Sequence, residues 1–392
     1  MQDIDYELDV LKKIVAVNSD SITKSGYKEC ADIVADEAQK IGLKVEIFDS
    51  KAKSSDKLPR PNVVTTLDVG APKTLLGIAH YDIVPPGEGW DYDPFNMKVD
   101  SSKAYGRGTA DDKGSIAVLL GAAQKVGEKS KVNFKILITP DEEVGGELGL
   151  GYLINDVGIR GDEALIVDAG TEFLSIAASG VVNGTITVKG IQGHAGYPHK
   201  FLNALQGMSK LIVELQKFQD FRERRLSRLD APPGSIKKKV WGRFSVTMLK
   251  CGVKSNIIPG EAEATFDMRL IPEEDTIQAQ NELQSFLENA NLGDPRYKVD
   301  LKFDLKGGNY FTDPQLPFVQ NFKKAVEKVT GESLLLAAEL GGNDGRYTSR
   351  KSIPTISYGP LAGDTHYHGV NEFVWLKDLK NVRDSIATYL KT

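Results

Sequence analysis

The chain has 392 residues, and its 49 basic and 54 acidic side chains give a formal net charge of −5. Hydrophobic residues make up 41% and charged residues 26%, a balance that is ordinary for a globular protein and excludes a disordered or fibrous chain. The mild acidity gives no electrostatic reason to bind nucleic acid or an anionic membrane, so we expect neither partner. Because a single core stops growing at about 250 to 300 residues, two domains are expected.

The N-terminal segment and the cysteines predict the compartment. Residues 1–20 lack the basic and apolar regions of a secretory signal, and no run of about 18 apolar residues occurs, so we expect a cytoplasmic protein without a transmembrane helix. Cys30 and Cys251 are the two cysteines, and they lie in unlike contexts. This favours neither a disulfide framework nor a thiolate metal cluster.

The first part of the chain alternates helix and strand patterns. Amphipathic periodicity predicts helices over 6–17 and 27–41, followed by strands over 44–49, 62–68 and 74–82. A helix of small and apolar residues is predicted over 114–126, and strands over 131–140 and 163–170. This alternation predicts an α/β sheet with helices on both faces. Polar residues gather where the strands end, which is where open α/β sheets place their ligand sites.

From about residue 180 the pattern indicates a smaller α+β unit. Strands are predicted over 184–190, 243–250 and 261–270, with helices over 203–218 and 275–290. The chain then returns to helix, strand and helix over 317–329, 354–359 and 376–389. We interpret this as an insertion that splits one catalytic domain, residues 1–178 and 308–392, by an inserted domain, residues 179–307. The basic run over 222–239 is interpreted as a solvated helix face followed by a Pro-Gly turn.

The histidines and acids of the chain favour a metal site. The five histidines are His80, His194, His199, His366 and His368, and all lie beside Gly, Asp, Pro or Asn-Glu clusters rather than inside apolar stripes. His80 and Asp82 fall on the same side of a strand end, where the carboxylate can orient the imidazole. Taken alone, this His-x-Asp triplet is more often an ordinary polar pair.

Further carboxylates follow at loops and strand ends. They occur in GRGTADDKG (Asp111, Asp112), TPDEEVGG (Asp141, Glu142, Glu143), VDAG (Asp168) and HYHGVNE (Glu372). The aspartate pair, read alone, has an ordinary helix N-cap as its alternative. Crowded acids repel one another unless cations or solvent screen them. Together with two histidines they form the nitrogen and oxygen set expected for two Zn²⁺-like or Co²⁺-like ions with open positions for water.

Taken in order, the motifs resemble those of the M20 metallopeptidase and deacylase family, which includes succinyl-diaminopimelate desuccinylase, acetylornithine deacetylase, aminoacylase and glutamate carboxypeptidase. The matching segments between residues 76 and 372 are AHYDIVPPGEGW, YGRGTADDKGS, TPDEEVGG, VKGIQGHAGYPH, SNIIPGEAEATFDMR, GGNDGR and HGVNE. The resemblance implies a metal-dependent exopeptidase-like catalytic domain, with a mixed sheet between helices, and an inserted α+β lid or dimerisation domain.

The resemblance also implies a ligand set for two divalent ions. One ion is expected to bind His80, Asp111 and Asp168. The other is expected to bind Glu143 and His368, with Asp111 bridging the two ions. We expect Zn²⁺, with Co²⁺ or Mn²⁺ as alternatives. Asp168 stands where glutamate is common in the desuccinylases, so this ligand is shorter by one methylene.

Three further residues receive catalytic roles from the resemblance. Asp82 would orient His80, and Glu142 would be the general base, since it is adjacent to a ligand without being one. His194 would reach the partner's site in a homodimer formed through the lid domain and stabilise the oxyanion. A cis peptide bond between Asp111 and Asp112 is also implied.

Substrate recognition is expected from residues that match substrate-contacting positions of the family. They are Asn256, Arg269 and Arg346, and arginine suits a bidentate carboxylate clamp. However, AASGVVNG, residues 177–184, stands where the desuccinylases usually have an arginine-bearing turn. This departure leaves the dicarboxylic substrate open.

The leading hypothesis is a dinuclear zinc-dependent amidohydrolase that acts on a small N-acyl amino acid and removes the N-acyl group by attack of a metal-activated water. The alternative is a di- or carboxypeptidase that cleaves short peptides. A noncatalytic metal-binding or peptide-binding relative is a remote third hypothesis, because such a protein should lack Glu142 or a ligand, and none is missing. A hydrolase with a lone nucleophile is disfavoured, since no GxSxG elbow is present and both cysteines lie outside the motifs.

Overall fold

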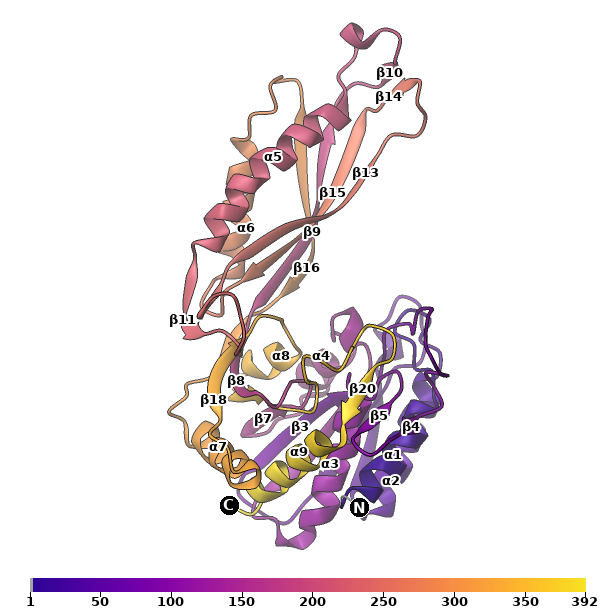
Figure 1. Cartoon of the computed structure of the whole chain (residues 1–392), viewed down its shortest axis with the longest axis vertical. Helices are drawn as coiled ribbons and strands as arrows, with labels where there is room; N and C mark the ends of the chain where they lie inside the picture. The colour runs from indigo at the N-terminus through magenta and orange to yellow at the C-terminus, as the bar shows by residue number, and fades with distance from the viewer. Residues whose placement is uncertain (1–2) are drawn as a thin grey trace. The chain divides into compact units, whose positions relative to one another are not determined.

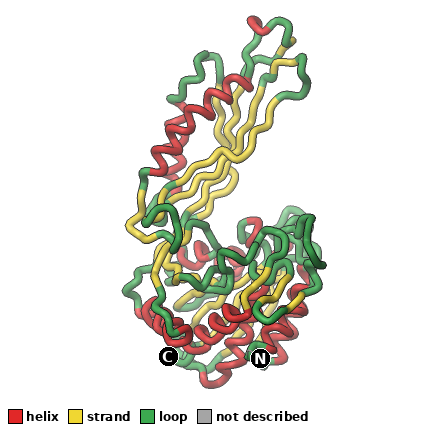
Figure 2. Tube along the Cα trace, viewed as in Figure 1, coloured by secondary structure: helices red, strands yellow, loops and turns green. Residues whose placement is uncertain are grey.

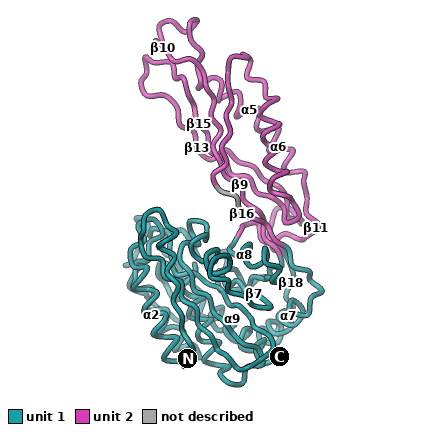
Figure 3. Tube along the Cα trace, turned by 180° about the vertical axis from the view of Figure 1, so that it is seen from behind, with its two compact units in different colours: residues 1–176, 311–337, 343–392 teal, residues 177–310, 338–342 magenta. Residues whose placement is uncertain are grey.

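The computed structural model describes residues 3–392, apart from the side chains of residues 305 and 306. The chain divides into two compact units (Figure 3). Unit 1 comprises Met1–Ile176, Phe311–Ala337 and Asn343–Thr392, and unit 2 comprises Ala177–Tyr310 and Ala338–Gly342. The sequence-based boundaries, after residues 178 and 307, differ from these by a few residues. The assignment of Ala338–Gly342 to unit 2 was not predicted.

A nine-stranded mixed sheet forms the centre of unit 1 (Figure 1). In spatial order its strands are β1 (Lys44–Asp49), β2 (Pro61–Leu67), β6 (Asn133–Thr139), β3 (Thr74–His80), β7 (Glu163–Ile166), β19 (Thr355–Ser357), β8 (Phe173–Ala178) and β17 (Tyr310–Phe311), with β18 (Leu335–Glu339) paired to β8. Strand β3 is parallel to β6 and β7, whereas β1, β2 and β6 pair antiparallel. The predicted mixed α/β sheet is therefore confirmed.

Helices cover both faces of this sheet (Figures 1 and 2). They are α1 (Asp5–Val15), α2 (Tyr27–Lys40), α3 (Lys113–Val126), α4 (Leu150–Tyr152), α7 (Pro317–Thr330), α8 (Gly345–Ser349) and α9 (Leu376–Tyr389). Strand β3 shows why both faces are covered. A Cβ on Gly77 would lie 2.6 Å from Leu119 of α3, while its neighbours Leu76 and Ile78 pack in a cluster that includes Leu150. Since side chains alternate along a strand, β3 is buried on both sides.

Smaller elements complete unit 1. A three-stranded sheet contains β20 (Phe373–Trp375), β5 (Lys103–Tyr105) and β4 (Lys98–Val99). Short 3₁₀ turns span Ser50–Ala52, Gly127–Lys129 and Glu142–Val144, and a π-helical turn spans Leu153–Val157. Strand β20 begins directly after Glu372, so this small sheet fixes the end of the C-terminal motif.

Unit 2 is an antiparallel sheet with two helices packed on it (Figures 1 and 2). Its strands, in spatial order, are β13 (Arg243–Cys251), β15 (Glu261–Leu270), β9 (Gly180–Lys189) and β16 (Lys298–Gly307), and its helices are α5 (Ala204–Glu223) and α6 (Thr276–Glu288). Apolar residues from both helices and the strands form one core, including Met208, Leu283 and Phe266. Two short ribbons pair β10 (Gly193–His194) with β14 (Ile257–Ile258), and β11 (Leu226–Asp230) with β12 (Lys239–Trp241), and a 3₁₀ turn spans Pro198–Lys200.

The interpretation of the basic run as a solvated helix face is wrong at its first residue. Arg222 is fully buried, and its guanidinium binds both oxygens of Glu274 at 2.6 and 2.7 Å. A buried arginine requires such a partner, which a local sequence pattern does not reveal. The Pro-Gly turn that follows connects β11 to β12. None of the helices within residues 3–392 is long and apolar enough to cross a membrane.

Candidate metal centre

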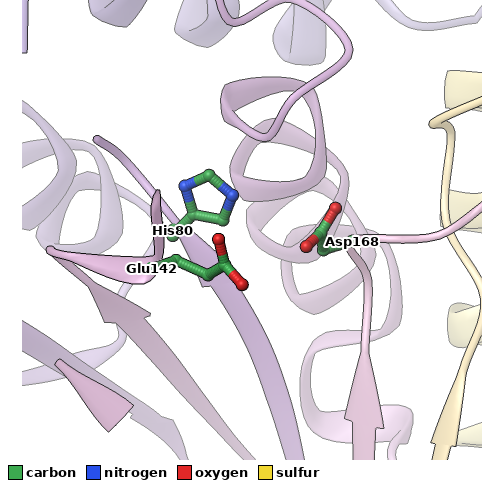
Figure 4. Close-up of side chains that lie close together, drawn as sticks. All are labelled: His80, Glu142 and Asp168. Atoms are coloured by element: carbon green, nitrogen blue, oxygen red, sulfur yellow. The ribbon is translucent and has the colours of Figure 1, made fainter. Parts of the chain in front are cut away.

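The central strands deliver the candidate ligands to one edge of the sheet. His80 is the last residue of β3, Glu142 and Glu143 follow the end of β6, and Asp168 follows the end of β7. Because β3 is parallel to both neighbours, these ends meet at the same edge. Figure 4 shows the side chains of His80, Glu142 and Asp168 grouped beside this edge.

Asp111 lies between two imidazoles. Its Oδ1 is 3.2 Å from His80 Nε2, and its Oδ2 is 3.0 Å from His368 Nε2. Nε2 of His368 is also 3.2 Å from Glu143 Oε2. The two oxygens of one carboxylate thus face two separate histidines, which is the arrangement required of a ligand shared by two ions.

Two groups of side chains have the spacing needed to hold an ion. Asp111, Glu143 and His368 form one group, and the other contains His80 and Asp168 together with Glu142. In each group the ligand atoms lie within 4.8 Å of one another. The spacing alone therefore does not distinguish Glu142 from a metal ligand. The assignment of Glu142 as the base rests on the resemblance of the TPDEEVGG motif.

The electrostatics of the site fit bound cations. Glu143 Oε1 is buried and has no hydrogen-bond partner, and the buried Nε2 of His80 faces the carboxylate of Asp111 at 3.2 Å. Burial, followed by repulsion from Asp112, raises the pKa of Asp168 well above its usual range. Burial opposes ionisation of Asp111 as well, but hydrogen bonds with His368 and His80 lower its pKa. Imidazole nitrogens that face carboxylate oxygens among crowded, buried acids are the donor set that divalent ions require, so the residues fit two such ions.

Asp82 links the histidine to the acidic loop. Its carboxylate accepts hydrogen bonds from the backbone N–H groups of Glu142 and Glu143, both at 3.2 Å. Nδ1 of His80 is 3.0 Å from the Asp82 backbone carbonyl and 3.4 Å from its Oδ1. The side chain is fully buried. Asp82 therefore holds the loop of the candidate base, and its backbone carbonyl makes the shorter contact with His80.

Asp141 belongs to neither group of candidate ligands, because its carboxylate is bound by other side chains. It adopts a left-handed backbone conformation with φ of 64°. Its carboxylate accepts a hydrogen bond from Tyr27 Oη at 2.9 Å, pairs with Lys24 at 2.9 Å and is also bound by Arg60 Nε. These contacts fix the residue immediately before Glu142. The partners lie in distant segments, so no local sequence pattern indicates them.

Arg346 binds the loop that carries Glu142 at a second point. Its guanidinium donates to the backbone carbonyl of Gly145 and lies 3.6 Å from Asp344. Tyr347 Oη donates to the same carbonyl at 2.7 Å. Both oxygens of Asp344 are buried without a hydrogen-bond partner. After burial itself, the charge of Asp344 is the largest cause that raises the pKa of Glu142.

The remaining predicted residues lie in unit 2. His194 is exposed, and its Nδ1 accepts the N–H of Gly196 at 3.0 Å. The backbone carbonyl of Asn256 accepts the N–H of Ala195 at 3.0 Å, so His194 and Asn256 lie on adjoining segments. Arg269 is on β15 and binds Asp267 at 2.7 Å.

The structure also shows the predicted peptide bond and the surroundings of the two remaining histidines. The peptide bond between Asp111 and Asp112 is cis, as predicted. His199 is exposed in the 3₁₀ turn of unit 2. His366 contacts the ring of Phe373, with ring centroids 5.5 Å apart. Neither His199 nor His366 belongs to the two groups of candidate ligands.

Arg243 was not singled out by the sequence. It faces Arg269 across the β13–β15 pair, and its guanidinium donates to Ser179 Oγ at 3.0 Å and to the carbonyl of Leu340 at 2.9 Å. Its Nε is buried without a hydrogen-bond partner. Burial, and then the charge of Arg269, lowers its pKa to about 10. Ser179 belongs to the AASGVVNG segment, so an arginine from another strand supplies a cation there.

Known proteins match this sequence and fold over most of their length. Residues 77–392 match the peptidase family M20/M25/M40. An uncharacterized metallohydrolase of Methanocaldococcus jannaschii is 29% identical over 360 residues, which cover 85% of this chain and 84% of the relative. A succinyl-diaminopimelate desuccinylase of Bordetella pertussis is 28% identical over 391 residues, which cover 96% of this chain and 95% of the relative.

Solved structures share the fold at lower identity. An M20 family metallo-carboxypeptidase from Sulfolobus solfataricus has a TM-score of 0.82 at 20% identity, with 99% of each chain covered. Human carnosine dipeptidase 1 has a TM-score of 0.77 at 18% identity, with 99% of this chain and 95% of that chain covered. These likenesses confirm the fold. The family match over residues 77–392 shows that the chain belongs to the peptidase family M20/M25/M40 and is a metal-binding hydrolase of amide bonds.

Proposed function

We propose that the protein is a dinuclear metal-dependent amidohydrolase that removes the N-acyl group from an amino acid, with Zn²⁺ as the resident metal. The observation that carries the proposal is Asp111, whose two oxygens face His80 and His368 at 3.2 and 3.0 Å. The sequence relatives favour deacylation, since the one from Bordetella pertussis is a succinyl-diaminopimelate desuccinylase.

Five side chains would hold the ions, and Glu142 would handle the proton. The ligands are His80, Asp111, Asp168, Glu143 and His368. When bound, two divalent ions supply a Lewis acid for the amide carbonyl and lower the pKa of a water at the site. Glu142 accepts the proton of the attacking water and returns it to the leaving amine. Asp82, Asp141 and Arg346 support this step by holding the loop that carries Glu142.

Arginine and asparagine side chains would recognise the carboxylates of the substrate. We propose Arg346, Arg269 and Asn256 as substrate-binding residues, and Arg243, which faces Arg269 across the β13–β15 pair, as an additional cation. An arginine beside uncharged acceptors keeps its charge available for an anionic ligand. His194 would stabilise the oxyanion of a partner's site in a homodimer formed through the lid domain.

The second candidate is hydrolysis of short peptides. The observation that favours it is the AASGVVNG segment, which lacks the arginine-bearing turn usual in desuccinylases. In this structure Arg243 reaches Ser179 in that segment. An Arg243→Met variant tests whether this arginine replaces the missing one. If Arg243 binds the acyl carboxylate, the variant should show a large rise in KM for an N-succinyl substrate and little change for an N-acetyl substrate.

The deciding experiment is a substrate screen on metal-defined enzyme. The protein is stripped with a chelator, reconstituted with Zn²⁺, Co²⁺ or Mn²⁺, and assayed with N-succinyl amino acids, N-acetyl amino acids and dipeptides. We expect no turnover by the stripped protein, and turnover of an N-acyl amino acid after two equivalents of metal are added. Turnover confined to dipeptides would replace the deacylase proposal with the peptidase one. Full activity of the stripped protein would refute both.

A further inference from the structure

Glu372 lies in the C-terminal motif, four residues after the candidate ligand His368, and neither group of candidate ligands includes it. Its side chain is fully buried. Oε1 accepts the N–H groups of Ala110 and Asp111 at 2.9 and 3.1 Å. Oε2 accepts the N–H of Gly108 at 3.1 Å and is bound by Arg107 Nη1 at 2.5 Å. Both oxygens of Glu372 are therefore occupied by donors from the loop that presents Asp111.

Arg107 extends this contact back to the other ligand. Its side chain is also buried, and Nη2 donates to the carbonyl of Gly369 at 2.7 Å. Gly369 follows His368, whose backbone is in the left-handed region with φ of 61°. The backbone of Glu372 adds a further bond, since its carbonyl accepts the N–H of Gly106 at 3.0 Å. One buried ion pair thus joins the segment that carries Asp111 to the segment that carries His368.

We infer that Glu372, paired with Arg107, is a positioning residue that sets the spacing between Asp111 and His368 and so determines the metal affinity of their group. The inference rests on the proposed metal-dependent function. Asp111 and His368 are separated by a long stretch of chain, so their 3.0 Å approach needs a fixed link between the two segments. Mutation of residues that hydrogen-bond to metal ligands and orient them typically changes metal affinity by about 10- to 100-fold.

The chemistry of the four donors explains why a carboxylate is required. A Glu372→Gln side chain has the same shape, but its amide NH₂ would point either at the N–H groups of Ala110 and Asp111 or at those of Gly108 and Arg107. Two acceptor bonds are lost in either orientation, and donors then face donors. The Asp111 loop should relax away from the NH₂ group, which lengthens the distance from Asp111 to His368.

The test measures metal affinity directly in the full-length protein. Zn²⁺ binding to the stripped protein is followed by competition with a chromophoric chelator, for wild type, Glu372→Gln and the control Glu163→Gln. Glu163 is likewise buried in unit 1, where it accepts hydrogen bonds from Tyr389 at 2.5 Å and Lys73 at 3.1 Å, and it lies at the start of β7, away from the ligand edge. We expect the affinity for at least one Zn²⁺ to fall 10- to 100-fold in Glu372→Gln and by less than twofold in Glu163→Gln.

Activity at high metal separates positioning from general damage. Turnover by Glu372→Gln should recover towards wild type as free Zn²⁺ rises, because the ligands themselves are intact. Unchanged Zn²⁺ affinity in Glu372→Gln, while wild type binds two ions, overturns this inference alone. Wild-type protein that binds no divalent cation refutes the proposed function and this inference with it. If Glu372→Gln does not fold, Glu372→Asp, which keeps the charge but is one methylene shorter, decides by the same affinity criterion.

Discussion

Replacing Glu142 by glutamine distinguishes a base from a ligand, a distinction that the spacing of the site leaves open. Glu142 lies within 4.8 Å of His80 and Asp168 atoms, so it has the geometry for either role. As a base it contributes about 10²- to 10⁴-fold to the rate, which corresponds to about 2.7 to 5.5 kcal/mol of the barrier. We expect Glu142→Gln to lose this factor in kcat while it still binds two ions, since all five proposed ligands remain.

The neighbouring residue is the matched control. Glu143 Oε2 is 3.2 Å from His368 Nε2, so Glu143→Gln should weaken metal binding, and added metal should partly restore its activity. Both variants are assayed for kcat at saturating substrate and for bound metal by elemental analysis. A Glu142→Gln enzyme with near-normal kcat would refute the base assignment. Loss of metal in Glu142→Gln together with loss of activity would make Glu142 a ligand instead.

Three other predictions follow from named contacts. Asp82→Asn should lower kcat/KM about 10- to 100-fold, as measured by steady-state kinetics. The Asp82 carboxylate accepts hydrogen bonds from two backbone N–H groups, each worth about 1.5 to 3 kcal/mol, and the amide keeps one acceptor oxygen instead of two. Mixing inactive His194→Ala with inactive Glu142→Gln chains should recover at most about a quarter of wild-type activity if His194 is donated to a partner's site, and absence of recovery in proven mixed dimers excludes the donation. Burial raises the pKa of Asp378 to about 6, so ionisation costs stability as the pH rises from about 4 through 6. Asp378→Asn should therefore raise the free energy of unfolding at pH 8 by up to about 3 kcal/mol and change it little at pH 4, as measured by urea denaturation.

The sequence predicted the parts of the fold that depend on local patterns. The strand over 74–82 and the helix over 114–126 were predicted from apolar runs, and the structure has them at Thr74–His80 and Lys113–Val126. Strand β16 was missed although Val299, Leu301 and Phe303 alternate with charged residues, which is a usable period-2 signal. The carboxyl ends of parallel strands meet at one edge of a sheet, so the sequence also predicted that His80 and Glu142 lie close together.

The parts that could not be predicted depend on contacts between distant segments. Asp141 was grouped with its acidic neighbours as a candidate for metal coordination, but Lys24 and Arg60 neutralise it from far along the chain. The partner of Glu372 is Arg107, which is 265 residues away. No spacing rule connects such residues, because their pairing is decided only when the two segments come together in the folded chain.

These distant contacts stabilise the loops that carry the buried acids. A site that gathers Asp168, Glu142 and Glu143 in a buried space destabilises the folded chain, since desolvation and mutual repulsion raise the pKa of each carboxyl. The loops that carry such residues would separate unless other contacts held them. Asp82 binds the Glu142 loop and Glu372 binds the Asp111 loop, each through backbone N–H groups. Backbone amides stabilise the carboxylate of Asp82, and backbone amides together with Arg107 stabilise that of Glu372, so the two loops are held while the candidate ligands stay available for metal ions.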